Sequence, residues 1–254
     1  MSASLRIIES TQNPQAKRWI ALTTARGIRK FSGFILSGRK TVPEALNLYA
    51  EHFESIISTS EDALNELAIA SHINRYIVSR ALFDLLDTNG TGFPLLVGQL
   101  PDMRDADLSS PPEGLELVCG LGDPSNLGAV LRSAAAFGVS RIILLESAAH
   151  PFHPKALRGG ANAQFRMRFL RGGNWENFSK AHGPVVALDG NGDDMRLYDW
   201  PHDLRLVLGE EGPGVPAWLH VGRLAIKTTG HIESLNATVA ASIALHSWFM
   251  AQGS

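Results

Sequence analysis

Residues Gly122 to Val139 read Gly-Asp-Pro-Ser-Asn-Leu-Gly-Ala-Val-Leu-Arg-Ser-Ala-Ala-Ala-Phe-Gly-Val, and this stretch decides the fold of the later part of the chain. The apolar residues from Leu117 to Leu121 indicate a buried strand that runs into a turn. Polar residues that can cap a helix come next, namely Asp123, Ser125 and Asn126. Apolar residues then recur at helical spacing, at Leu127, Val130, Leu131, Ala134 and Phe137. Gly138 can end that helix, and Ile142 to Leu145 reads as a second strand, so the stretch predicts a strand–loop–helix–strand unit.

The loop of this unit does not match the common phosphate-binding loops. Gly120 and Gly122 give G-x-G, but Ser125 stands where the dinucleotide fingerprint has its third glycine, and no Gly-Lys-Ser/Thr follows for a P-loop. Its unusual polar residues are Asn126 and Arg132. Six helical residues rise about 9 Å and helical side chains lean toward the N-terminus, so Arg132 can reach back toward Asn126. From this unit alone, two interpretations are equally favoured. Asn126 and Arg132 could have a functional role, or Asn126 could be only a helix cap and Arg132 only a solvated surface residue.

Two later stretches change that interpretation. Residues Leu206 to Val215 read Leu-Val-Leu-Gly-Glu-Glu-Gly-Pro-Gly-Val, and residues Ile226 to Ala241 read Ile-Lys-Thr-Thr-Gly-His-Ile-Glu-Ser-Leu-Asn-Ala-Thr-Val-Ala-Ala. In this order and at this spacing, the three stretches resemble the three signature motifs of the SpoU (TrmH-like) RNA 2′-O-ribose methyltransferases of the SPOUT class. The resemblance covers residues from about Leu115 to Phe249, and three motifs in series are far more specific than one.

The resemblance implies an α/β fold in two domains: a small α/β substrate-binding domain at residues 1–100, a linker at 101–113, and a SPOUT α/β domain at 114–254 with a C-terminal trefoil knot. The residues themselves support part of this, because strand and helix patterns alternate before residue 100 and a polar, proline-bounded stretch follows. Three short pieces are similar to the ribosomal-protein-like domain that precedes the catalytic domain in many of these enzymes, namely Ser10–Pro14, Phe34–Arg39 and Ser79–Val97.

The resemblance also implies a reaction, the transfer of a methyl group from S-adenosylmethionine to a ribose 2′-hydroxyl of ribosomal or transfer RNA. The sulfonium makes the donor reactive, so the protein has to align the reacting atoms and assist the loss of a poorly acidic proton. Arg132 matches the family's catalytic arginine and would bind phosphate and the developing alkoxide. The residues that would position Arg132 and the ribose are Asn126, Glu211, Ser234 and Asn236. The residues that would frame the donor are Leu188, Gly209, Ile226 and Leu235.

The segment from His150 to Asn162 carries two histidines three residues apart. No cysteine or carboxylate stands near enough to complete a metal site, and the prolines indicate an irregular loop, so no metal is expected. The segment resembles a family loop with an Arg-Ala-Ser-x-Gly core, in which Lys155 and Arg158 would face RNA. Gly159-Gly160-Ala161 departs from that core and removes its serine. Lys227-Thr228 is a second departure, since the family has Pro-Met there.

Composition describes a globular chain: of 254 residues, 44% are apolar and 19% are charged. The net charge is −2, so a nucleic-acid partner has to be argued from local charge. The first forty residues carry eight Lys and Arg against Glu9 as the single acid. Two interpretations stay open: an ordinary solvated helix face, or a basic patch that meets phosphate. In the second case Lys17, Arg18 and Arg39 would bind RNA.

The cysteine content points to a reducing compartment. Cys119 is the single cysteine and lies in an apolar run, so no disulfide can form within the chain, and we expect a cytoplasmic protein. The first residues lead into no signal peptide, and no apolar run approaches membrane-spanning length.

Two other functions fit the sequence less well than a methyltransferase. A non-catalytic RNA-binding protein that retained the fold would be expected to have lost Asn126, Arg132 or the Ser234-Leu235-Asn236 run, and all are present. An ordinary doubly wound nucleotide-binding enzyme is disfavoured by the missing third glycine. A homodimer through the catalytic domain is expected, because the family typically dimerises through its C-terminal region. Trp248, Phe249 and Met250 would supply an apolar patch there.

Overall fold

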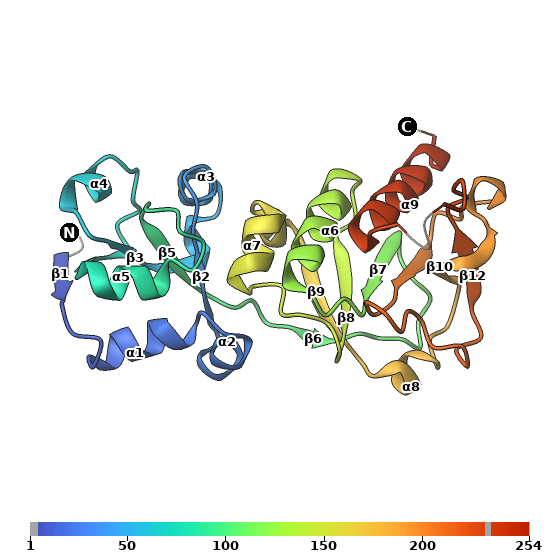
Figure 1. Cartoon of the computed structure of the whole chain (residues 1–254), viewed down its shortest axis with the longest axis horizontal. Helices are drawn as coiled ribbons and strands as arrows, with labels where there is room; N and C mark the ends of the chain where they lie inside the picture. Colours follow the sequence, from blue (N-terminus) through green and yellow to red (C-terminus); the bar gives the residue numbers. More distant parts are fainter. Residues whose placement is uncertain (1–4, 232–234, 254) are drawn as a thin grey trace. The chain divides into compact units, whose positions relative to one another are not determined.

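The computed structural model describes residues 5–231 and 235–253 (Figure 1). As described, the chain forms two compact units, each with its own sheet. The first unit contains Met1–Pro101 together with His150–Phe165, and the second contains Asp102–Ala149 together with Arg166–Ser254. The segment His150–Phe165, which the predicted boundaries place in the later domain, thus packs with the first unit. We call this segment the arm.

The first unit is built on a mixed sheet. The order across the sheet is β1 (Leu5–Ile8), β4 (Asn74–Val78), β3 (Phe53–Ser58), β5 (Leu95–Gln99) and β2 (Gly33–Leu36). β1, β4 and β3 are parallel, whereas β5 runs antiparallel to both β3 and β2. The helices formed by the first hundred residues are α1 (Pro14–Ala21), α2 (Ala25–Phe31), α3 (Thr41–Leu48), α4 (Glu61–Asn65) and α5 (Arg80–Leu86).

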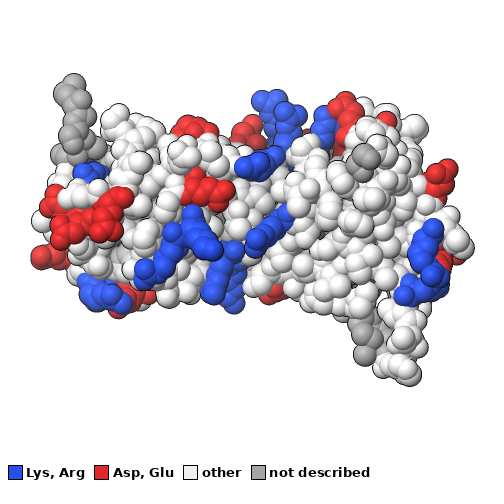
Figure 2. All heavy atoms as spheres, turned by 90° about the horizontal axis from the view of Figure 1, so that it is seen from above, with Lys and Arg blue, Asp and Glu red and all other residues white. Residues whose placement is uncertain are grey.

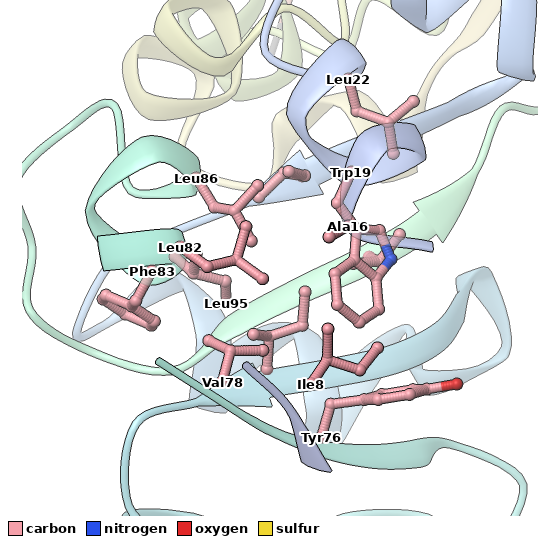
Figure 3. Close-up of a cluster of buried hydrophobic side chains, with 13 residues drawn as sticks. Ile8, Ala16, Trp19, Leu22, Tyr76, Val78, Leu82, Phe83, Leu86 and Leu95 are labelled. Atoms are coloured by element: carbon pink, nitrogen blue, oxygen red, sulfur yellow. The ribbon is translucent and has the colours of Figure 1, made fainter. Parts of the chain in front are cut away.

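Apolar side chains of α1, α5 and the sheet form a core of the first unit (Figure 3). Trp19 of α1 is fully buried and meets Tyr76 of β4 edge to face, with ring centroids 4.9 Å apart. The two helices start where a polar side chain satisfies a free amide: Asn13 caps α1 and Ser79 caps α5. Local capping and shared burial therefore place both helices on the sheet.

The second unit is built on a parallel sheet. Its order is β12 (Gly222–Ala225), β10 (Val185–Asp194), β11 (Leu204–Leu208), β7 (Leu115–Cys119), β8 (Arg141–Leu145), β9 (Arg168–Gly173) and β6 (Arg104–Asp105). Each pair of neighbours is parallel, which confirms the predicted α/β class. α6 (Pro124–Ala136) joins β7 to β8 as predicted, and α9 (Ala237–Ala251) packs beside it (Figure 1). α8 (Trp175–Phe178) follows β9. Across the described residues, no helix is both long and apolar enough to cross a membrane.

The arm contains a helix where the sequence predicts an irregular loop. α7 spans Pro154–Gly160. Pro154 stands in its first turn, where the missing amide of proline has no helical partner to lose, and the His153 side chain caps the helix. Two left-handed residues, Ala161 and Asn162, then end it. The loop prediction is wrong because the proline starts a helix rather than interrupting one.

A buried ion pair fixes the start of the second unit to its sheet. Arg205 of β11 is 1% exposed, and its Nε donates to Glu116 Oε2 of β7 at 2.8 Å. Its other nitrogens donate to the carbonyl oxygens of His182 at 2.6 Å and Ser110 at 2.9 Å. Buried charges are tolerated when they are paired and hydrogen-bonded in this way. The polar stretch predicted as a linker is therefore held against the sheet at Ser110.

We expect Arg205→Ala to lower the free energy of unfolding by about 3–5 kcal/mol, because it leaves a buried carboxylate without one of its partners. Arg196→Ala is the matched control, since Arg196 pairs with Asp194 at the surface, where ion pairs contribute little. Urea denaturation followed by circular dichroism measures both variants. Equal effects of the two substitutions would show that the buried pair does not hold the unit together.

Candidate active site

Two loops meet where the parallel strands end. β7 and β11 are paired in register up to Cys119 and Leu208, so the loops that follow them leave the sheet side by side. The Gly120 amide extends this pairing by donating to the Leu208 carbonyl at 2.9 Å. Ligands of open α/β sheets bind outside the carboxyl ends of the strands. This edge is therefore the candidate active site, and it brings the first two motifs together.

Glu211 joins the two loops. Its carboxylate accepts hydrogen bonds from the amides of Gly122 at 2.7 Å and Asp123 at 3.2 Å, and from Asn126 Nδ2 at 3.4 Å. Asp123 in turn caps α6 by accepting from the Asn126 amide at 2.8 Å. A carboxylate at this position also interacts favourably with the positive end of the helix dipole. Glu211 thus binds Asn126 in the first turn of α6 from a loop 85 residues away in sequence.

The loop that carries Glu211 is itself closely held. Glu210 and Gly214 exchange two backbone hydrogen bonds, of 3.1 and 2.9 Å, across it. A Cβ at Gly209 would lie 2.4 Å from the Gly214 carbonyl carbon, so only glycine fits there without a shift. The Glu210 carboxylate accepts from Trp175 Nε1 of α8 at 2.9 Å. Sequence reasoning missed Trp175, because a tryptophan after a short strand gives no signal of a partner 35 residues later.

The third motif reaches the site through α9. Asn236 caps that helix by accepting from the Thr238 and Val239 amides at 2.9 and 3.4 Å. Thr238 Oγ1 donates to Asn126 Oδ1 at 3.4 Å, which sequence reasoning also missed. Asn236 therefore positions the start of α9. Ser234, the other predicted residue of this motif, lies outside the described residues.

Arg132 is exposed on α6, two turns after the capping residues. Within the described chain its guanidinium makes no ion pair and no hydrogen bond, including none to Asn126 or Glu211. The predicted reach of Arg132 back to Asn126 is thus not a contact here. An exposed guanidinium with five free donors is suited to bind an anion.

Three of the predicted donor-binding residues, Leu188, Gly209 and Ile226, lie in or next to segments that Arg223 joins. Leu188 of β10 and Ile226, which follows β12, are half-buried, and residues 189–192 loop out of β10 between two pairings with Leu224. Arg223 pairs with Asp189 at the start of this loop. It also donates, at 2.8 Å, to the carbonyl of Pro216 in the segment that follows Gly209.

Hydrogen bonds determine the charge of the Asp189 carboxylate at the start of the 189–192 loop. The pKa of Asp189 is lowered, first by the Asn191 amide and then by Arg223, so the Asp189–Arg223 pair is ionised at neutral pH. Leu235, the fourth predicted donor-binding residue, is half-buried just before α9.

The predicted RNA-binding residues lie in the first unit and differ in their surroundings. Arg18 NH1 pairs with Glu54 Oε1 at 2.7 Å, so its charge is neutralised. Lys17 is exposed on the same helix, and Arg39 is exposed with its guanidinium 5.8 Å from the Phe93 ring. Lys155 and Arg158 are exposed on α7 of the arm.

Comparison with known proteins adds independent findings. The model of the SpoU rRNA methylase family matches residues 117–246. Ribosomal RNA small subunit methyltransferase G 2 of Syntrophobacter fumaroxidans is 37% identical over 96% of this chain, which spans about half (49%) of that protein. The 23S rRNA (guanosine(2553)-2′-O)-methyltransferase RlmP of Bacillus subtilis is 28% identical over 95% of this chain and 98% of its own length. Among solved structures, an AdoMet-bound rRNA methyltransferase from Sinorhizobium meliloti shares the fold, with a TM-score of 0.77 and 23% identity over 96% of this chain and 97% of that one.

We expect Glu211→Ala to loosen the junction of the two loops, because three N–H groups lose a charged acceptor at once. Hydrogen exchange at the Gly122 and Asp123 amides should become at least about tenfold faster, which corresponds to ~1.4 kcal/mol of local stability. Glu210→Gln serves as the control, since its amide oxygen can still accept from Trp175. Unchanged exchange in Glu211→Ala would mean that other contacts hold the loop.

Proposed function

The chain belongs to the SpoU rRNA methylase family, and we propose that it transfers a methyl group from S-adenosylmethionine to a ribose 2′-hydroxyl of RNA. The observation that carries the proposal is the meeting of all three motifs at one edge of the sheet. Glu211 of the second motif binds the loop of the first, and Thr238 of the third contacts Asn126. The names of the Syntrophobacter and Bacillus relatives support ribosomal RNA as the first substrate to test.

The donor site fits S-adenosylmethionine in its chemistry. Leu188 and Ile226 offer half-buried apolar surface, and a Cβ at Gly190 would meet nothing within 4 Å, so the 189–192 loop leaves space for a ligand at Gly190. With Gly209 and Leu235, these residues would hold the donor. Its sulfonium supplies a methyl group that is ready for nucleophilic attack.

The protein's own part is to align the ribose oxygen and balance its charge. The Arg132 guanidinium would bind an RNA phosphate and stabilise the alkoxide that develops as the 2′-hydroxyl releases its proton to water. The ribose oxygen then bonds to the methyl carbon while the methyl–sulfur bond breaks, and S-adenosylhomocysteine leaves as a neutral thioether. Guanidinium keeps its own proton at neutral pH, so Arg132 acts through its charge. The Glu211 carboxylate is occupied by three N–H donors, and it therefore positions the first motif.

We further propose that the C-terminal stretch forms the trefoil knot of the SPOUT class. The support is that the segments around Val215, Arg223 and α9 pack closely within the second unit. Arg223 of β12 donates to the Val215 and Pro216 carbonyls, and α9 packs along α6, where Ser242 Oγ and Ser133 Oγ lie 2.8 Å apart.

A homodimer through α9 completes the proposal. Val239, Ile243 and Met250 fall four and seven residues apart on α9 and are exposed, Val239 to 47% and Met250 to 56%. A stripe of this kind is typical of an interface. Trp248, predicted on the patch, is instead 8% exposed, and its indole N–H donates to the Pro201 carbonyl at 3.1 Å. It belongs to the packing of the unit itself.

We expect Arg132→Ala to reduce methyl transfer by at least about 100-fold while donor binding stays unchanged, because Arg132 lies on α6 and the proposed donor residues do not. Methyl transfer is measured under single-turnover conditions with a labelled methyl group and ribosomal RNA from a strain that lacks the gene. Donor binding is measured by calorimetry. Lys180→Ala controls for the loss of an exposed cation. Near-normal transfer in Arg132→Ala would remove Arg132 from the chemistry. Donor binding without any transfer by the unmodified chain would instead indicate a non-catalytic RNA-binding protein.

We expect Ile243→Glu to convert a dimer into a monomer, because it places a charge in the middle of the apolar stripe on α9. Sedimentation equilibrium at micromolar concentration measures the mass. Glu176→Gln, an exposed change outside α9, should remain dimeric. If the unmodified chain is a monomer, the proposed homodimer is contradicted. If Ile243→Glu is still a dimer, the interface does not lie on α9.

A further inference from the structure

The indole of Trp175 lies against both loops that carry the first two motifs. Its Nε1 donates to Glu210 Oε1 at 2.9 Å. A Cβ placed on Gly120 would lie 3.3 Å from Trp175 Cζ2 and 3.4 Å from Glu210 Cγ, so both side chains come close to Gly120. Trp175 is half-buried and also packs on the hydrophobic core of the second unit. One side chain of α8 thus meets the segments that follow β7 and β11.

α8 gives this indole a firm support. Asn174 Oδ1 accepts from the Asn177 amide at 2.9 Å, and Asn177 Oδ1 accepts from the Asn174 amide at 3.1 Å, which makes a reciprocal cap at the start of the helix. Phe178 at the end of α8 is buried, and its ring meets that of Trp175 edge to face with centroids 6.5 Å apart. Tryptophan has only two side-chain torsions, so fixing its ring costs little conformational entropy.

The neighbouring carboxylates Glu210 and Glu211 have separate partners. Glu211 accepts from the loop of the first motif, whereas Glu210 accepts from α8. Adjacent carboxylates repel one another, and N–H donors offset that cost for both of them. Figure 2 shows a wide area of the second unit without charged side chains, so close carboxylates are not a feature of that face. The loop from Gly209 to Gly214 is therefore held at two consecutive residues by two different elements.

The loop held in this way begins with Gly209, one of the predicted donor-binding residues. Gly209 directly precedes Glu210, and the two backbone hydrogen bonds between Glu210 and Gly214 close the loop just beyond it. A loop held by Glu211 alone could still rotate about that contact, and such a rotation would move Gly209. The hydrogen bond from Trp175 to Glu210 opposes this rotation because it fixes a second point of the same loop.

We propose that Trp175 is a positioning residue of the donor site, because its indole N–H holds Glu210 and thereby keeps Gly209 in the conformation that binds S-adenosylmethionine. The inference rests on the proposed function for the identity of the ligand. A site that is already ordered binds more tightly, since less entropy is lost on binding. Trp175 acts through the loop and not on the reacting atoms. Its loss therefore weakens donor binding and leaves the chemical step at saturating donor nearly unchanged.

The test removes each partner of this hydrogen bond in turn, in the full chain. Trp175→Phe keeps an aromatic ring and loses the indole N–H, and Glu210→Met keeps a side chain of similar length and loses the acceptor. Calorimetry without RNA measures the Kd for S-adenosylmethionine. We expect each variant to raise this Kd by about tenfold, because each breaks a hydrogen bond to a charged group. Glu210→Gln keeps an oxygen that can accept from the indole, so its Kd should rise by less than about threefold.

Trp248→Phe is the matched control. It also removes an indole N–H that is hydrogen-bonded within the second unit, to the Pro201 carbonyl at 3.1 Å, and it should bind the donor like the unmodified chain. The double variant Trp175→Phe/Glu210→Met should bind no more weakly than either single one, since both substitutions break the same bond. An unchanged Kd in Trp175→Phe, an equal loss in Trp248→Phe, or additive losses in the double variant would overturn the proposal.

A second measurement needs no methyl donor. Hydrogen exchange at the Glu210 and Gly214 amides, which close the loop, should become about tenfold faster in Trp175→Phe and stay unchanged in Trp248→Phe. Glu210→Met serves in both measurements if Trp175→Phe fails to fold, as judged by its melting temperature. Unchanged exchange would contradict the positioning role. If the unmodified chain binds no donor, the proposed function fails, and exchange still decides whether Trp175 holds the loop.

Discussion

Glu211 places one carboxylate against the first turn of α6, and the geometry of the candidate site depends on that contact. The parallel register of β7 and β11 brings the two loops to one edge, and the three hydrogen bonds to Glu211 then join them. The same contact orients Asn126, which Thr238 of the third motif touches from α9. A single acidic side chain therefore connects segments from three parts of the sequence.

Charged residues of the chain fall into two classes that do different work. Arg205 and Arg223 are paired with carboxylates and also donate to backbone carbonyls, so they fasten loops to the sheet of the second unit. Most of the five N–H donors of each guanidinium are therefore used within the unit. Arg132 has its donors free across the described residues, and free donors are what phosphate recognition requires. The pairing state thus distinguishes structural arginines from candidate binding ones where composition cannot.

The sequence was sufficient for features that are local or that recur as motifs. The strand, capped helix and second strand around Asn126 follow from hydrophobic spacing and capping residues, and the α/β class follows from their alternation. It was insufficient where a distant partner decides. Trp175 donates a hydrogen bond to Glu210, and the two residues meet because β9 and β11, which precede them, lie in one sheet. Trp248 is buried, and its indole N–H donates to the carbonyl of Pro201, which is distant in the sequence. Asn236 has a motif position, but its oxygen caps its own helix, which capping rules alone could have indicated.

The arm also has a consequence for how such a chain can be recombined. A crossover near residue 101 would exchange the first unit's sheet and its helices α1 to α5 but leave the arm behind, so Phe152, Phe165 and Asn162 would face a foreign surface. Two stretches of the gene, separated by some fifty codons, therefore have to be inherited together for the first unit to stay intact. In a chimaera between relatives, the residues lining the seat of the arm and those on the arm itself would form one block of coevolving positions. Recombination of two relatives near residue 101 would therefore give an intact first unit only where both parents have matching residues at the contact between the arm and the first unit.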